Sequence, residues 1–212
     1  IFFYIIPKFQ SIFESFDAEL PALTKAVMGF SNLVSAQAIF IIPGLIAAGA
    51  GIWFWKKTES GTRFFDTMFL KLPVVGEVVH QVAIARLAKT LSLLIDSGMS
   101  IVETLQLSEK TVGNTVIAEE LASVRQEIVK GSTLSQQLEK QDHFPRLLVS
   151  MASAGEESGQ LAPMLSKVAM HYERESSASI DGLVSLLEPA ILVGLGATVA
   201  VVVVAVYMPI FK

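Results

Sequence analysis

The chain has 212 residues, no cysteine and a formal net charge of −4, with 52% hydrophobic and only 17% charged residues. Soluble domains carry roughly 25% charged residues, so this composition indicates a membrane protein. The lack of cysteine excludes disulfides and thiolate metal ligands. The acidic balance disfavours nucleic-acid binding, which requires concentrated positive charge.

The chain opens with six apolar residues, IFFYII, before Pro7. A cleavable signal would need a basic start and small residues at the cut, and this segment has neither. We therefore interpret residues 1–6 as the end of a preceding membrane-spanning helix. Residues 7–32 are predicted to form a short loop or helix on the periplasmic side.

Residues 33–55 are predicted to form a complete membrane-spanning helix. No charged residue lies between Lys25 and Lys56. About 20 apolar residues, rising ~1.5 Å each, cross a hydrocarbon layer of ~30 Å. Trp53 and Trp55 close this stretch, as aromatic residues do at a membrane interface.

Residues 186–208 are the second predicted span. Positions 189–211 carry no charge and include the run VAVVVVAVYMPIF. In water this β-branched run would favour a strand, but in lipid a lone strand leaves its backbone unpaired at several kcal/mol per group. A helix is therefore predicted.

The distribution of basic residues predicts the orientation. Four cations follow the first complete span within residues 56–72, whereas residues 7–25 hold only two. Basic residues close to a span favour the cytoplasmic side. Residues 56–72 are thus predicted to be a cytoplasmic basic linker, and the protein a multi-pass membrane protein.

Residues 73–181 are predicted to form a cytoplasmic bundle of six helices, because apolar residues recur at helical spacing throughout. Caps and glycines set the boundaries. The first predicted helix ends at Gly98. The second covers 101–112, begins with the capping box Ser100–Glu103 and is closed by Gly113, and the third runs from Asn114 to Gly131. The fourth runs from Ser132 or Thr133 to Leu138, the fifth starts at Pro145, and the sixth covers 161–172 and continues beyond. The predicted fold class is all-α.

The sixth predicted helix has no firm break between Tyr172 and the Glu188-Pro189 pair. It is therefore expected to run nearly continuously toward the last span. Glu188 is the only charged residue between Asp181 and Lys212. An ionisable residue in a span is a candidate for proton relay or buried pairing, but Glu188 would also suit the hydrated edge of the membrane, which we favour.

Motifs for catalysis are absent from the sequence. No G-x-x-x-x-G-K-[ST] phosphate loop occurs, and His80, His143 and His171 have no partner at metal-ligand spacing. We therefore predict no catalytic residue, no cofactor and no metal site.

The segment Gly155–Gly159, GEESG, is not a nucleophile elbow, because its serine is fourth and its flanks are helical. Its two glycines predict a tight interhelical turn, in which Ser158 or the glutamates would cap the following helix. Such a turn is either simply solvated or an acidic corner that faces a partner.

Several short motifs are spread along the chain. Their residues, which are also the candidates for partner contact, are Arg86, Gly98, Asn114, Gly131, Gly155, Glu156, Ser158, Gly159, Tyr172, Glu188 and Pro189. Read together, these motifs resemble the type II secretion F domain family, the inner-membrane platform proteins of type IV pilus and type II secretion machines. The resemblance spans essentially the whole chain, and each motif alone is weak.

The resemblance implies a non-catalytic platform that couples a hexameric assembly or retraction ATPase to insertion of pilin or pseudopilin subunits. It also implies two related cytoplasmic domains, of which this sequence matches only the second. Other inner-membrane assembly proteins and the lipid bilayer are further expected partners, and small residues in both spans suit a homo-oligomer. The alternatives are a small transporter or channel subunit with Glu188 in a polar pathway, and a membrane-tethered signalling protein.

Overall fold

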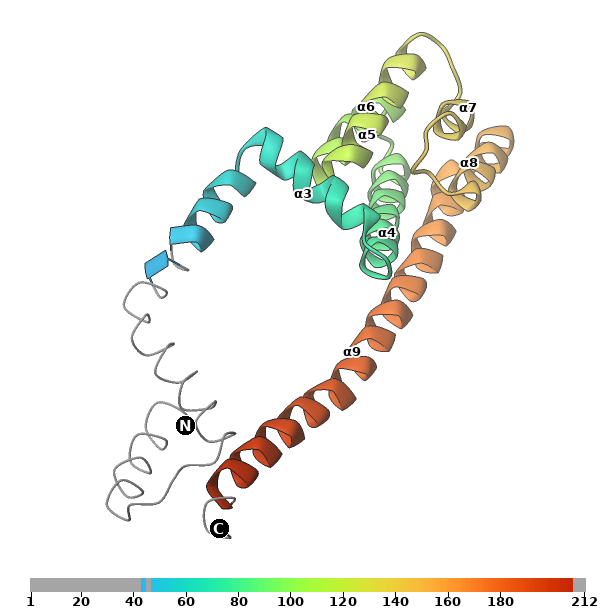
Figure 1. Ribbon diagram of the computed structural model, residues 1–212. Coiled ribbons are helices and arrows are strands. Elements are labelled where there is room, and N and C mark those ends of the chain that lie inside the picture. The colour runs from blue at the N-terminus through green and yellow to red at the C-terminus, as the bar shows by residue number, and fades with distance from the viewer. Residues whose placement is uncertain (1–42, 45–46, 208–212) are drawn as a thin grey trace. The chain divides into compact units, whose positions relative to one another are not determined.

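The computed structural model describes residues 43–44 and 47–207, and these form helices joined by short turns, without a strand among them (Figure 1). The chain divides into two units. One unit is Trp55–Val184, called the domain below. The other contains the remaining residues, of which 43–44, 47–54 and 185–207 are described. The prediction of an all-α fold is confirmed.

Residues 47–56 are helical, and seven further helices, α3 to α9, follow them in the described part of the chain. The helices α4 to α9 correspond to the six helices expected from the sequence, and one helix that was not expected, α3, precedes them. The helices are α3 (Glu59–Lys71), α4 (Val75–Asp96), α5 (Ile101–Thr111), α6 (Thr115–Val129), α7 (Leu134–Glu139), α8 (Arg146–Ser158) and α9 (Leu161–Tyr207).

The addition is α3, which occupies the stretch predicted as a basic linker. Thr58 begins this helix, since its side chain accepts a hydrogen bond from the Gly61 amide at 3.2 Å. The helix packs against α4 and α6. Residues 59–71 are therefore part of the folded domain rather than a connection to it.

Three helices of the domain end in the same way. After α4, α6 and α8 the chain passes through Gly98, Gly131 and Gly159, all with positive φ of 83°, 97° and 68°. The amide of the next residue then bonds a carbonyl five residues earlier, at 2.9–3.2 Å. This is a Schellman turn, in which glycine avoids the steric cost that a Cβ would meet.

The starts of α5 and α6 carry the predicted caps. The Ser100 hydroxyl accepts from the Glu103 amide at 3.3 Å and donates to the Glu103 carboxylate at 2.8 Å. Asn114 accepts from the amides of Val116 and Ile117 at 3.0 and 3.3 Å, and it is only 3% exposed. Both capped starts were predictable because the bonds involve neighbours in sequence.

Replacing Asn114 by alanine is expected to lower the free energy of unfolding by about 1 kcal/mol, because the two amides lose their acceptor. For a chain of this size the melting temperature should fall by roughly 2–4 °C. Circular dichroism of the detergent-solubilised protein measures this shift. Asn114→Ser keeps a capping oxygen and should melt close to the parent; equal melting of the serine and alanine variants would contradict the capping role.

The core of the domain is built around α4. Its buried residues Ile84, Leu87 and Leu91 are fully inaccessible to solvent. They belong to one hydrophobic cluster with inward-facing residues of α5, α6, α7, α8 and the first turns of α9. The other large side chains in that cluster with 0% exposure are Leu105, Ile117, Leu121, Val124, Leu138, Leu148 and Leu165.

Side-chain contacts tie α4 to the beginning of α9. Ser92 donates to the Ala162 carbonyl at 2.8 Å, and Ser179 donates to Gln81 at 3.1 Å. Between these, Lys89 pairs with Glu173 at 3.3 Å. Because the α4 numbers fall as the α9 numbers rise, the two helices run in opposite directions within the domain.

The helix α9 has 47 residues and contains Pro189, so the expectation of near-continuity is confirmed. Among the described residues, two helices have the length and apolar composition to cross a membrane: α4, and Leu161–Val201 of α9. α4 is 44% buried over its most apolar window and belongs to the domain core, whereas the corresponding window of α9 is 0% buried. α9 is therefore the better candidate for a span. The predicted segments 1–6, 7–32 and most of 33–55 lie outside the described residues.

Candidate functional site

The α7–α8 corner of the domain contains the acidic motif residue Glu156. Its carboxylate accepts hydrogen bonds from the amides of Leu134 and Ser135, at 2.5 and 3.1 Å, and from the Ser135 hydroxyl at 2.5 Å. These are the first residues of α7, and its N-cap Thr133 makes no side-chain cap bond. Glu156 therefore caps α7 from a distance of more than 20 residues in sequence, and its charge suits the positive end of that helix.

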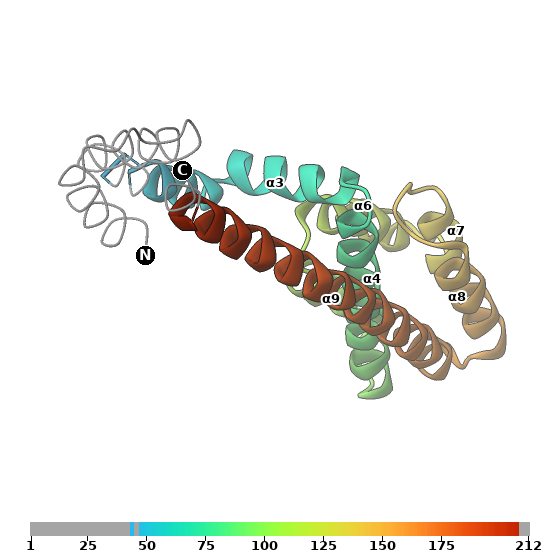
Figure 2. The ribbon, with the colours of Figure 1, turned by 60° about the horizontal axis from the view of Figure 1, so that its bottom comes forward.

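This arrangement corrects the prediction for Glu156. It was expected to cap the following helix if it capped any, but it caps α7, which precedes it. α7 and α8 lie side by side in both ribbon views (Figures 1 and 2), and they are in contact along their length. Glu156 is the polar link between them.

An open cleft of about 710 Å³ lies between α7 and α8. Its lining combines carboxylates with hydroxyl groups, so the surface offers hydrogen-bond acceptors and negative charge. The polar lining residues are Thr133, Ser135, Gln136, Glu139, Ser150, Ser153, Glu156 and Glu157. Glu157 is exposed. A basic segment of a partner protein is the chemistry that this cleft would best accommodate.

Replacing Glu156 by alanine is expected to destabilise the domain by about 2 kcal/mol, because two partly buried amides of α7 lose a charged acceptor. Chemical denaturation of the solubilised protein measures the change in the free energy of unfolding. The control is Glu157→Ala in the same turn, which should change stability by less than about 0.5 kcal/mol. If both variants unfold alike, the cap does not stabilise the domain.

The predicted turn over Gly155–Gly159 is much shorter than expected. α8 continues to Ser158, and only Gly159 takes the left-handed conformation. The Ser158 hydroxyl donates to the Ala154 carbonyl at 2.6 Å within α8 rather than capping α9. The prediction was wrong because two glycines were interpreted as turn residues, although only one of them turns the chain.

Gly155 lies inside α8 for a packing reason. A Cβ at this position would come within 2.8 Å of the Leu161 Cα and 3.1 Å of its Cδ1. The Gly155 carbonyl also accepts the Gln160 amide at 2.9 Å. The absence of a side chain lets the start of α9 fold back closely against the end of α8.

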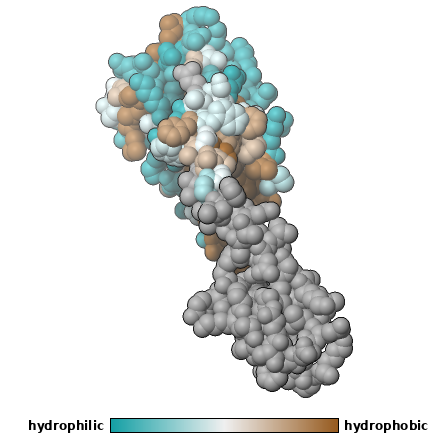
Figure 3. All heavy atoms as spheres, turned by 60° about the vertical axis from the view of Figure 1, so that its left-hand side comes forward, coloured by the Kyte–Doolittle hydropathy of each residue, from teal (hydrophilic) through white to brown (hydrophobic). Residues whose placement is uncertain are grey.

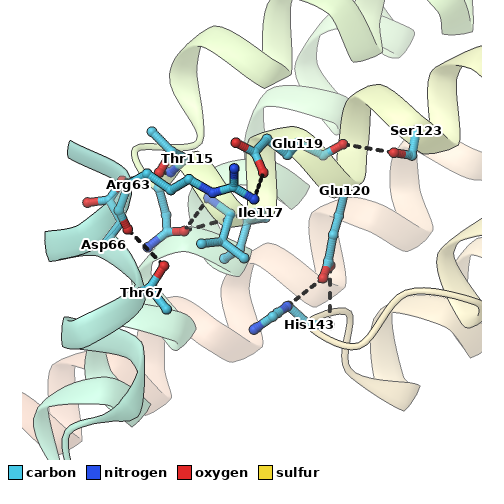
Figure 4. A network of polar contacts seen from close by, with 11 residues as sticks. Arg63, Asp66, Thr67, Thr115, Ile117, Glu119, Glu120, Ser123 and His143 are labelled. Carbon is cyan, nitrogen blue, oxygen red and sulfur yellow. Dashed lines mark hydrogen bonds and ion pairs between the residues drawn. The ribbon is translucent and has the colours of Figure 1, made fainter. Parts of the chain in front are cut away.

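A second polar region joins α3 to α6 (Figure 4). Asp66 accepts from both the amide and the hydroxyl of Thr115, each at 2.8 Å. One turn away, Arg63 pairs with Glu119 at 3.0 Å. Asp66 thus caps α6 alongside Asn114 and fixes the orientation of α3 on the domain.

On the next face of α6, Glu120 binds the loop that precedes α8. Its carboxylate contacts the His143 Nδ1 at 2.5 Å and accepts from the His143 amide at 3.3 Å (Figure 4). The His143 carbonyl in turn accepts from His80 of α4 at 2.6 Å. The two histidines are therefore brought together as structural links between α4, α6 and this loop.

The remaining motif residues are dispersed through the structure. Arg86 is exposed on α4 and its guanidinium lies over Gly113, so that a Cβ at Gly113 would clash with it. Gly98 and Gly131 form turns, and Tyr172 is part of the core at 8% exposure. Glu188 and Pro189 are exposed positions of α9. The motif as a whole marks turns, caps and close packing rather than one pocket.

The electrostatics of the domain are those of structural ion pairs. Arg125 donates to Glu109 at 2.5 Å across α5 and α6, and this hydrogen bond raises the pKa of the guanidinium. Within the part of the chain that the structure describes, no group of three histidine, aspartate or glutamate residues is placed to hold a metal ion.

Comparisons with known proteins identify the group to which these features belong. Residues 87–209 match the family described as type II secretion system (T2SS), protein F. The chain is 39% identical over 210 residues to the type IV pilus assembly protein TapC of Aeromonas hydrophila, a match that covers 99% of this chain and 51% of the relative.

Of two relatives from Pseudomonas aeruginosa, one is named for type IV pilus assembly and the other for type II secretion. The type IV pilus assembly protein PilC is 36% identical over 211 residues, covering 98% of this chain and 56% of the relative. The type II secretion system protein F is 31% identical over 209 residues, covering 99% of this chain and 52% of the relative. The chain thus spans about half the length of the curated relatives it matches. With the family matched over more than half of its residues, the chain belongs to the type II secretion system protein F family.

Proposed function

We propose that this chain is part of a non-catalytic platform protein of the bacterial inner membrane, which couples a cytoplasmic assembly ATPase to the insertion of pilin or pseudopilin subunits. The observation that carries the proposal is the match to proteins named for type IV pilus assembly and type II secretion over 98–99% of the chain. The resemblance implies insertion of pilin or pseudopilin subunits in both kinds of machine, so a shared platform would serve the same mechanical step.

The path of α9 supports a mechanical role. Its first turns are held in the domain by core residues such as Leu165 and by the contacts of Ser179 and Glu173 with α4. The same helix continues into residues 189–207, which carry no charge. A movement imposed on the domain would therefore be passed along this one helix, because its backbone hydrogen bonds link neighbouring turns, except at Pro189, which has no N–H to donate.

The orientation follows from the basic residues that flank the apolar segments. Four cations, Lys56, Lys57, Arg63 and Lys71, follow residues 33–55 and support a cytoplasmic location for this end. The domain, residues 55–184, is then cytoplasmic as well, where a soluble ATPase could reach it.

The ATPase would supply the chemical energy. The sequence has no phosphate-binding loop, and the motif residues serve the fold. We place the contact with the ATPase at the cleft between α7 and α8, on the side of the exposed Glu157. Glu156 is engaged with α7, so it would hold the shape of the cleft rather than bind the partner directly.

Site-specific photo-crosslinking tests this proposal. A crosslinking amino acid at position 157, introduced into the whole platform protein in cells that are assembling fibres, should capture the ATPase. The control position is Leu107, which is 40% exposed on α5 and lies outside the cleft. The proposal fails if neither position nor affinity purification from membranes recovers an ATPase or a pilin. Capture at position 107 alone would move the contact to another face.

A further inference from the structure

α3 has two faces of different character. The face toward the domain is fixed by Asp66, which binds Thr115, and by Arg63, which pairs with Glu119. On the opposite face, Phe64 and Met68 are one helical turn apart and point away from these contacts. Phe64 is 53% exposed and Met68 is 37% exposed.

The turn into α4 extends this apolar surface. Leu72, Val74 and Val75 are 40%, 58% and 39% exposed. At the other end Trp55, 48% exposed, lies beside Phe64, with the ring centroids 5.5 Å apart and the ring planes tilted by 34°. Apolar areas interrupt the hydrophilic surface of the domain in Figure 3. A contiguous group of large exposed apolar side chains on a folded domain marks an interaction surface.

The polar residues of this segment suit phosphate groups. Residues 56–71 contain four cations, Lys56, Lys57, Arg63 and Lys71, and two acids, Glu59 and Asp66. Asp66 is already engaged by Thr115 and Arg63 by Glu119. Lys56 precedes α3 and Lys71 ends it, and both are exposed. Long basic side chains beside an apolar helix face are typical of helices that lie in the headgroup layer of a membrane.

The chain leading into α3 leaves little distance to the apolar segment before it. Residues 47–56 are helical, and α3 begins only a few residues later. The turn between them is tightly built: Thr58 donates to the Trp55 carbonyl at 2.6 Å, and a Cβ on Gly61 would clash with that carbonyl. Two extended residues span about 7 Å at most, so α3 starts close to the end of the preceding helix.

We propose that α3 is an interfacial helix whose outer face, Phe64 and Met68, lies in the headgroup region of the bilayer together with the flanking Trp55 and Leu72. This inference rests on the membrane location proposed above, and it adds a defined lipid-binding surface to the domain. The lipid surface would hold the domain against the membrane through α3, independently of α9.

The absence of cysteine makes a direct test possible. Single cysteines are introduced as Phe64→Cys and Met68→Cys in the full chain and labelled with an environment-sensitive fluorophore. The protein is placed in nanodiscs of phosphatidylethanolamine and phosphatidylglycerol. The control for exposure is Val129→Cys on α6, 65% exposed, and the control for membrane insertion is Val193→Cys on α9, 72% exposed.

Two quenchers read out the position of each label. Labels at 64 and 68 are expected to be quenched by spin-labelled lipid at least about threefold more than the label at 129, and by aqueous iodide correspondingly less. The label at 193 should be quenched by lipid in either case. Using two positions on the face guards against a local disturbance by one label.

The outcomes separate this inference from the proposal on which it depends. If position 193 is quenched by lipid but 64 and 68 behave like 129, α3 is not interfacial although the chain is in the membrane. If 64 and 68 are shielded from iodide without lipid quenching, a protein surface covers the face, and the inference is overturned. If 193 is not quenched by lipid, the membrane location itself is wrong.

Discussion

Proline in place of Ser177 is expected to abolish fibre assembly or secretion while leaving the protein in the membrane. Ser177 lies in the middle of α9, where its hydroxyl donates to the Glu173 carbonyl at 2.8 Å. Proline removes a backbone donor and clashes with the preceding turn, at a cost of about 3 kcal/mol or more in a helix interior. The helix would kink within the part packed on α4, just before the Ser179–Gln81 contact and ahead of the apolar part.

The measurement is fibre number or secreted product in cells whose own copy carries the change, with the amount of membrane protein determined in parallel. Ser177→Ala is the matched control, because it removes the hydroxyl bond but favours the helix, and it should assemble at the parental rate. Normal assembly by the proline variant at normal abundance would show that α9 does not transmit movement as a continuous helix.

Valine in place of Gly155 is expected to lower the free energy of unfolding by about 3 kcal/mol, because overpacking a close helix contact forces the backbone to move. The obstacle is the Leu161 Cα, 2.8 Å from the position of a Cβ. Since that neighbour is backbone, it cannot rotate away as the tip of a flexible side chain would. Gly155→Ala should show a smaller loss in the same direction.

Gly182→Ala provides the control. Gly182 is also helical, but a Cβ there would have no atom within 4 Å. Alanine is the better helix former by about 1 kcal/mol, so this variant should be at least as stable as the parent. Denaturant unfolding of the solubilised proteins compares the three variants. An unchanged midpoint for Gly155→Val would mean that α8 and α9 are not closely packed at this point.

The helices of the domain were largely predictable because their ends are set by local contacts. Ser100 and Asn114 bond amides two or three residues away, and the glycine turns at Gly98 and Gly131 close over five residues. Each such contact leaves a signature within a short window of sequence. The family resemblance uses many of the same residues, which explains why its motifs coincide with caps and turns.

The contacts that define the candidate site were not predictable in this way. Glu156 reaches Leu134 across 22 residues, and Asp66 reaches Thr115 across 49. An acidic residue looks the same in sequence whether it faces solvent or the start of a distant helix. Which of the two it faces is determined only by how the helices pack. Gly155 was misjudged for a related reason, since the neighbour that excludes a side chain belongs to the next helix.

α3 had a signal that the charge pattern obscured. Its four flanking and internal cations favoured a basic linker, but Thr58 is a good N-cap and Phe64, Phe65, Met68 and Phe69 recur at helical spacing.

The hydroxyl residues on the buried face of α5 were not predictable. This helix places Thr104 and Ser108 in the core at 0% exposure. Small hydroxyl residues at such positions permit close helix packing, but their burial cannot be foreseen from a sequence that would equally suit a solvated helix.

Deleting the gene that encodes this chain from its source bacterium most directly tests whether it belongs to a fibre-assembling or secreting machine. We expect surface fibres or secreted substrates to disappear while the amounts of pilin and ATPase stay the same, and the intact gene to restore them. Fibres and secretion at parental levels after deletion would contradict this role.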